Sequence, residues 1–140
     1  MRSVRNNILP LIVLMVLVSS CAKDDDPKVA VRDDYLGLWQ CDEYDTNQQL
    51  IATFQIEIIA HPSDADKILI DNFTQLGLGF QVEAIISNTS LEIPQQFISS
   101  TEEVSGSGFI TNAHTGLELQ YTYDDGSGQP ESISATCVKL

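Results

Sequence analysis

Residues 117–123 read Leu-Glu-Leu-Gln-Tyr-Thr-Tyr, an unbroken alternation of apolar and polar side chains. Successive side chains of a β-strand point to opposite faces, so this pattern predicts a strand with one face in a core and the other in water. The same alternation occurs in residues 54–58 and in residues 78–86, where Leu78 and Phe80 begin the apolar series. Helical periodicity is almost absent after residue 35, and the sequence therefore predicts an all-β domain.

Turn-forming residues divide this domain into eight predicted strands. The predicted strands are residues 37–45, 50–60, 67–73, 78–87, 90–94, 104–112, 116–124 and 131–139. Short connections favour an antiparallel meander, and eight such strands can close into a small barrel without exposed edges. A β-sandwich is the alternative. Residues 94–103 fit least well and are expected to form a loop or an irregular edge. Gly106 and Gly108 indicate a bulge or a close backbone contact.

The N-terminal 21 residues have the composition of a secretory signal. Arg2 and Arg5 precede an apolar run at residues 8–18, which is shorter than the roughly 20 residues that a spanning helix needs. The run leads into Val-Ser-Ser-Cys at residues 18–21, which resembles the lipobox of bacterial lipoproteins. The resemblance implies that Cys21 is acylated and held in a membrane by several fatty chains. A plain signal peptide with an incidental cysteine is the alternative.

The residues that follow Cys21 are polar and rich in aspartate. Such a segment cannot bury a core, so residues 22–33 are predicted to be a flexible, acidic tether. Its beginning, Ala-Lys-Asp-Asp-Asp, resembles the surface-export signal of Bacteroidetes lipoproteins; a solvated spacer is the alternative. The predicted organisation is a signal peptide at 1–21, a tether at 22–33 and one domain at 34–140. The expected location is the bacterial outer membrane, with the domain either exposed on the cell surface or facing the periplasm.

The charge of the chain limits the classes of partner that it can bind. Its formal net charge is −13, and Lys67 and Lys139 are the only lysines or arginines after residue 33. Such an acidic surface repels phosphate backbones and anionic lipid headgroups. We therefore expect no nucleic-acid partner, and membrane association only through the lipid on Cys21.

Two further cysteines, Cys41 and Cys137, lie near the two ends of the predicted domain. An even pair of cysteines in an exported domain indicates a disulfide. Closure of the meander would make the first and last strands neighbours, and that arrangement would bring these two residues together. Two separate buried thiols are the alternative.

Gly37-Leu38-Trp39 opens the first predicted strand, and a Gly-x-Trp at that place resembles the first motif of lipocalin barrels. The order of several later stretches resembles small lipocalin-like lipoproteins of Bacteroidetes. Those stretches are residues 67–73, 91–96, 106–110 and 135–137. The resemblance implies a small barrel with Trp39 packed across its base. Arg32 is the last arginine of the chain, so the arginine that stacks on this tryptophan in lipocalins has no counterpart.

The sequence contains no recognisable catalytic or cofactor motif. His61, with Asp64 and Asp66 nearby, lacks the spacing of a metal site. Residues 124–128, Asp-Asp-Gly-Ser-Gly, fit a hairpin turn better than a calcium loop. We therefore expect neither an enzyme nor a protein that needs a metal or a cofactor.

Two functions remain for a lipid-anchored barrel. The first is a noncatalytic, lipocalin-like module that binds a small apolar or glycan ligand at one mouth. The aromatic candidates for lining such a site are Trp39, Phe80, Phe109, Tyr121 and Tyr123. The second is a structural or interaction protein of the outer membrane surface that contacts a protein partner and holds no internal ligand. An open interior favours the first function, and a sealed interior favours the second.

Overall fold

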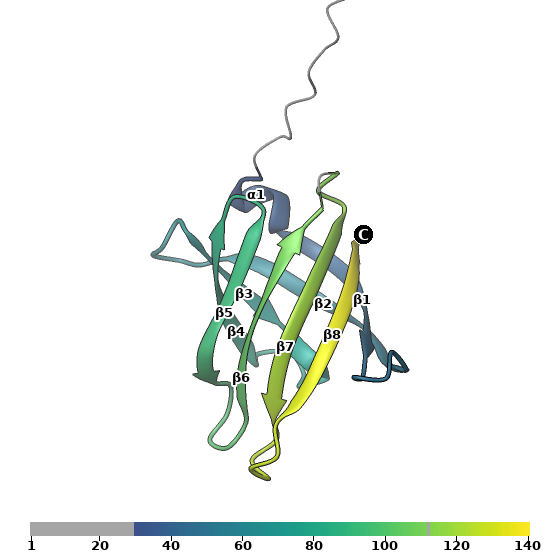
Figure 1. The fold of residues 1–140 in the computed structure, drawn as a ribbon. Helices are drawn as coiled ribbons and strands as arrows, with labels where there is room; N and C mark the ends of the chain where they lie inside the picture. The colour runs from purple at the N-terminus through teal and green to yellow at the C-terminus, as the bar shows by residue number, and fades with distance from the viewer. Residues whose placement is uncertain (1–29, 112) are drawn as a thin grey trace, which may run out of the picture.

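The computed structural model describes residues 30–111 and 113–140. In this part of the chain, eight antiparallel strands form one closed barrel, in which consecutive strands pair and β1 also pairs with β8. The elements are α1 Arg32–Tyr35, β1 Gly37–Tyr44, β2 Leu50–Ala60, β3 Lys67–Asp71, η1 Phe73–Gln75, β4 Gln81–Ser87, β5 Ser90–Phe97, β6 Glu103–Ile110, β7 Gly116–Asp124 and β8 Glu131–Lys139. Figure 1 shows α1 at one end of the barrel and the long strands β6, β7 and β8 side by side. The predicted meander and its closure are confirmed, and the sandwich alternative is wrong.

The largest correction to the predicted strands concerns the start of β4. The alternation predicts a strand from residue 78, but β4 begins at Gln81. Leu78 is 82% exposed and Phe80 is 42% exposed, so neither belongs to the core. Gly77 and Gly79 both have positive φ angles, which only glycine adopts without strain. The backbone therefore turns repeatedly here, and the sequence alternation does not continue as a strand.

The seam between β4 and β5 is completed by a side chain. Only three residue pairs form the ladder between these strands, and the ladder of β5 with β6 shifts register between Ile93 and Gln96. Beyond the short ladder, the Glu83 N–H donates to Gln96 Oε1 at 2.9 Å, and Gln96 Nε2 donates to the Glu83 carbonyl at 2.7 Å. The predicted irregularity after residue 94 is thus a bent end of β5, which extends to Phe97.

Strand β3 ends at Asp71, two residues before its predicted end, because Asn72 adopts a left-handed conformation with φ 58°. The short helix η1 follows and turns Phe73 into the barrel, where it is 2% exposed. Thr74 and Gln75 also have positive φ angles, which are costly for residues other than glycine. This strained segment plugs the end of the barrel opposite α1.

The first described residue, Ala30, is 5% exposed. Of residues 30–33, predicted to belong to the tether, Ala30 is therefore buried and Arg32 Nη1 donates to the Asp64 carbonyl at 3.4 Å, whereas Val31 is 56% exposed. In α1, Tyr35 is fully buried; its carbonyl accepts a hydrogen bond from Trp39 Nε1 at 2.8 Å, and its hydroxyl donates to the Asn88 carbonyl at 3.0 Å. These bonds fix α1 across one mouth of the barrel.

Trp39 is fully buried beneath this cap. Lys139 Nζ lies 5.3 Å from the centre of the Trp39 ring and donates to the Asp34 carbonyl at 2.7 Å. A cation over an indole face is stabilised by the ring quadrupole. The last lysine of the chain thus supplies the cation for which the sequence offers no arginine.

The core fills the barrel from wall to wall. All eight strands contribute inward side chains that are at most 7% exposed. Gly106 and Gly108 face inward on β6. A Cβ on Gly106 would come within 2.5 Å of the backbone carbonyl oxygen of Gln120 and of Tyr121 Cβ. The predicted close backbone contact is confirmed, because Tyr121 and Leu119 of β7 occupy the space that larger residues of β6 would need.

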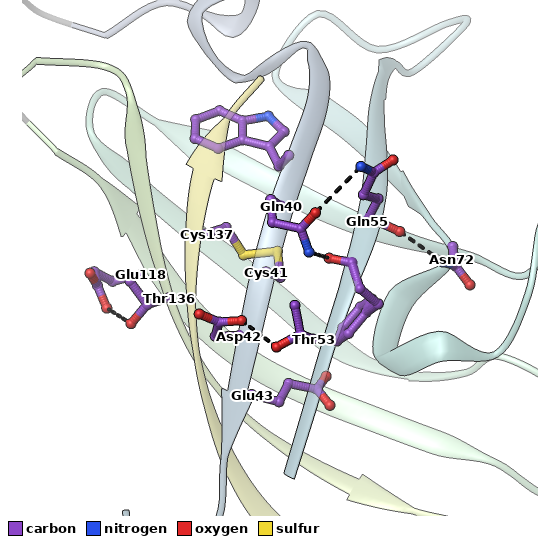
Figure 2. The surroundings of a disulfide bond; sticks show 12 residues. Gln40, Cys41, Asp42, Glu43, Thr53, Gln55, Asn72, Glu118, Thr136 and Cys137 are labelled. Carbon is purple, nitrogen blue, oxygen red and sulfur yellow. Dashed lines mark hydrogen bonds between the residues drawn. A yellow bond between two sulfur atoms is a disulfide. The ribbon is translucent and has the colours of Figure 1, made fainter. Parts of the chain in front are cut away.

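The disulfide Cys41–Cys137 joins β1 to β8 inside the barrel, and the predicted bond is confirmed. Figure 2 shows it between cross-strand pairs on the outer wall, where Thr53 donates to Asp42 and Thr136 donates to Glu118. Cys21, the signal peptide and residues 22–29 of the tether lie outside the described residues.

Candidate functional site: a filled interior and an open outer wall

One acidic side chain, Glu43, is buried inside the barrel, where it is 2% exposed. It lies on β1 and accepts a hydrogen bond from the Tyr121 hydroxyl of β7. The Thr74 side chain of η1 bonds to this pair, and the rings of Phe73 and Tyr121 are 4.7 Å apart. The two strands that flank β8 and the segment η1 therefore meet at one polar point.

Burial raises the pKa of Glu43, and hydrogen bonds from Tyr121 and Thr74 lower it in part. Burial and the neighbouring Glu43 charge also raise the pKa of the Tyr121 hydroxyl. The hydrogen-bond partners of the Glu43 carboxyl are the hydroxyls of Tyr121 and Thr74, and neither hydroxyl carries a positive charge that would neutralise a carboxylate. The arrangement shifts the carboxyl toward its protonated form relative to an exposed glutamate, and it connects β1, β7 and η1.

The space beside this pair is small. A void of about 10 Å³ lies between Glu43, Phe73, Tyr121 and the disulfide, which suffices for about one water molecule. A drug-sized ligand needs several hundred Å³. The interior at this level is therefore filled by the protein's own side chains.

The five aromatic candidates do not line one common site. Trp39 and Tyr121 are core residues with 0% and 4% exposure. Along the barrel axis, the disulfide lies between them. Tyr123 is partly buried and donates to Glu102 at 2.6 Å. Phe80 lies in the connection before β4, and Phe109 points outward from β6 with 52% exposure.

The outer wall of β6, β7 and β8 carries six neighbouring polar side chains, which we call the polar grid. They are Ser105, Ser107, Gln120, Thr122, Ser132 and Ser134. The register aligns them in two rows of three across the strands. Within the described residues, none of the six side chains has a hydrogen-bond partner. The donors and acceptors of the grid therefore do not bond to other protein groups in this part of the chain.

Two surface hollows meet at the polar grid. One measures about 410 Å³ and reaches the turn between β1 and β2 at Asp45 and Gln48. The other measures about 470 Å³ and reaches Phe109 and Glu118. Both are lined by Ser107, Gln120 and Ser134, so together they form one groove along the outer wall.

Other features of the described chain offer little chemistry. No three His, Cys, Asp or Glu side chains of the described residues come together as a set of metal ligands. His61 instead pairs with Glu83 at 3.3 Å. None of the helices in residues 30–111 and 113–140 has the length and hydropathy to cross a membrane.

The fold defines a small, closed, antiparallel barrel of eight strands, which is consistent with a lipocalin-like barrel. No protein-family model matches the chain, and no curated protein matches it significantly. The site must therefore be interpreted from its own geometry.

Two features of the site were not predicted from the sequence. Glu43 follows Trp39 and Cys41 at spacings of two, so strand parity could have placed it inside. No sequence feature predicts that the side chains of the polar grid lack hydrogen-bond partners, because side chains of the same types elsewhere on the wall do bond to one another. Gln55 with Gln40 is one example.

Proposed function

We propose that this chain is a noncatalytic, lipid-anchored lipoprotein of the bacterial outer membrane. Its barrel holds no cargo and contacts an external partner with its outer wall. The observation that carries this proposal is the filled interior, with a void of about 10 Å³ beside Glu43 and Tyr121. A carrier of apolar molecules needs a cavity of several hundred Å³.

The proposed anchor is acyl chains on Cys21, which follow from the lipobox resemblance. The acidic composition supports a lipid as the means of attachment, since a net charge of −13 repels anionic headgroups. The described chain enters the barrel at α1 (Figure 1). The opposite end and the side walls are then free to meet a partner, whether the domain faces the cell surface or the periplasm.

The first function considered for such a barrel, a module that binds a small apolar or glycan ligand at one mouth, finds less support. Both mouths are blocked by the chain itself, one by α1 with Tyr35 and the other by η1 with Phe73. The aromatic side chains that could have lined an internal site either belong to the core or face solvent.

Native mass spectrometry of the protein extracted from its membranes in detergent tests this proposal. The expected mass is that of the polypeptide from Cys21 with its acyl groups, and with no additional noncovalent molecule. The Cys21→Ala variant should lack the acyl mass and appear in the soluble fraction. A bound apolar molecule of reproducible mass would contradict the proposal that the interior holds no cargo, whereas a retained oligosaccharide would not; an unacylated membrane form would contradict the anchor.

A further inference from the structure

The side chains of the polar grid do not bond to one another across the strands. Some polar side chains on other strands of the outer wall do: Gln55 donates to Gln40 at 3.3 Å, and Lys67 donates to Glu83 at 2.7 Å. The six side chains of the polar grid have no partner among the described residues. Polar atoms left free side by side on a rigid sheet are available to a ligand.

The grid has a regular spacing that the sheet imposes. Ser107, Gln120 and Ser134 form one row across β6, β7 and β8, and the other three side chains form the second row. Neighbouring strands lie about 4.8 Å apart, so each row is about 10 Å wide. A ligand must therefore present several hydrogen-bonding groups at close and repeated intervals.

The chemical types of the six grid side chains further limit the class of ligand that the grid can bind. Five of the six are hydroxyls and the sixth is an amide, and each of these can both donate and accept a hydrogen bond. Hydroxyl groups of a polyol match such partners in either role. Peptide groups alternate donors and acceptors, but a protein strand would pair best with a sheet edge, and a closed barrel offers none.

Charge excludes one class of polyol. The grid itself is uncharged, while carboxylates border the groove at Asp45 and Glu118. The chain has a net charge of −13. An anionic polysaccharide would be repelled by these groups, whereas a neutral one meets an uncharged floor.

An aromatic ring stands at one end of the groove. Phe109 lines the larger hollow and is 52% exposed. An exposed ring offers an apolar face to the C–H side of a sugar, and this contact complements the hydrogen bonds of the grid.

We propose that the groove over β6, β7 and β8 binds a neutral oligosaccharide. Ser107 and Gln120 bond to its hydroxyls, and Phe109 stacks on one ring. This inference rests on the proposed function, in which the outer wall makes the contact, and it names the chemical class of the partner. The two hollows together offer the volume that a binding site for a small molecule needs.

Isothermal titration calorimetry of the lipidated protein in detergent tests the proposal. The probes are the hexasaccharides of β-glucose, α-glucose, mannose and xylose, with the hexamer of galacturonic acid as the anionic control. At least one neutral probe should bind, and the anionic hexamer should not. The double variant Ser107→Ala/Gln120→Ala should bind about tenfold more weakly, because it removes two hydrogen bonds to the ligand.

Matched controls separate this site from general surface effects. Thr53→Ala removes a hydroxyl from the outer wall of β2, where it is already bonded to Asp42, and should not change the affinity. Phe109→Ala should weaken binding, whereas Phe97→Ala, which removes a still more exposed ring on β5 (67% exposed), should not. Circular dichroism establishes that each variant is folded.

Three results would overturn the inference. They are no binding of any neutral probe, equal binding by the double variant, and tighter binding of the anionic hexamer. A photo-crosslinker at Gln120 that captures one protein of defined mass in cells would overturn it as well. None of these results bears on whether the interior holds a cargo, which native mass spectrometry decides separately.

Discussion

Cys41 and Cys137 face each other directly in the ladder between β1 and β8, and their disulfide closes the barrel where the first and last strands meet. The bond links positions 96 residues apart in the sequence. It therefore constrains nearly the whole folded chain at the seam that depends on the most distant contacts.

Removal of this disulfide should destabilise the barrel strongly. We expect the Cys41→Ala/Cys137→Ala variant to lose about 4–5 kcal/mol of unfolding free energy, since a cross-link across a loop of this length restricts the unfolded chain by that amount. Urea unfolding measures the loss. A reducing agent should destabilise the wild type and leave the double variant unchanged; equal effects on both would contradict the prediction.

Glu43 should make the stability depend on pH. Its pKa is raised in the folded state, so its protonated form is favoured there. This contribution to the free energy of unfolding is fully present below the pKa of glutamate in the unfolded chain. It is lost as the pH rises through the pKa of Glu43 in the folded state. Each unit by which the pKa is raised corresponds to about 1.4 kcal/mol. Glu43→Gln should remove this loss and be more stable than the wild type at pH 8.

The measurement is the urea midpoint from pH 4 to pH 8. Glu118→Gln is the control, because Glu118 lies on the outer wall and accepts from Thr136. Its pH profile should follow that of the wild type. A Glu43→Gln profile parallel to the wild type would show that Glu43 is not the group responsible.

Gln96→Ala should loosen the seam between β4 and β5. The variant leaves the Glu83 N–H and carbonyl without their bonds, at a cost of about 1–3 kcal/mol. Hydrogen exchange at the amides of β4 should become faster. Gln95→Ala is the control, since Gln95 bonds only to the exposed Glu103 side chain, and it should leave this exchange unchanged. Equal protection in both variants would contradict the role of Gln96.

Gly106→Ala should be poorly tolerated. The added Cβ would come within 2.5 Å of the Gln120 oxygen and of Tyr121 Cβ, and such overpacking costs about 1–3 kcal/mol or more. Thermal unfolding measures it. Ser107→Ala, which changes the next residue on the outer face, should have little effect. A stable Gly106→Ala variant would mean that β6 and β7 can move apart at no cost.

The sequence predicted the features that depend on alternation and on chain closure. The face of Leu117, Leu119 and Tyr121 follows from the period of two, and the Cys41–Cys137 bond follows from pairing the first strand with the last. The same rule failed at Leu78 and Phe80, because two glycines with positive φ angles turn the backbone before β4 begins.

Other features depend on three-dimensional contacts that no local pattern encodes. Phe109 lies between Gly108 and Ile110, so apolar residues on both sides hide which face it takes. Lys139 reaches Trp39 only because β8 runs beside β1. The bonds of Gln96 to Glu83 arise from a bend in β5 that the sequence marks only by Pro94.

A high-resolution crystal structure of the protein purified from its own membranes tests the central claim most directly, because it shows what fills the barrel. Our account predicts no density inside the barrel beyond its side chains and about one water beside Glu43 and Tyr121. Elongated density of a ligand between Trp39 and Tyr121, with Phe73 displaced from the core, would contradict it.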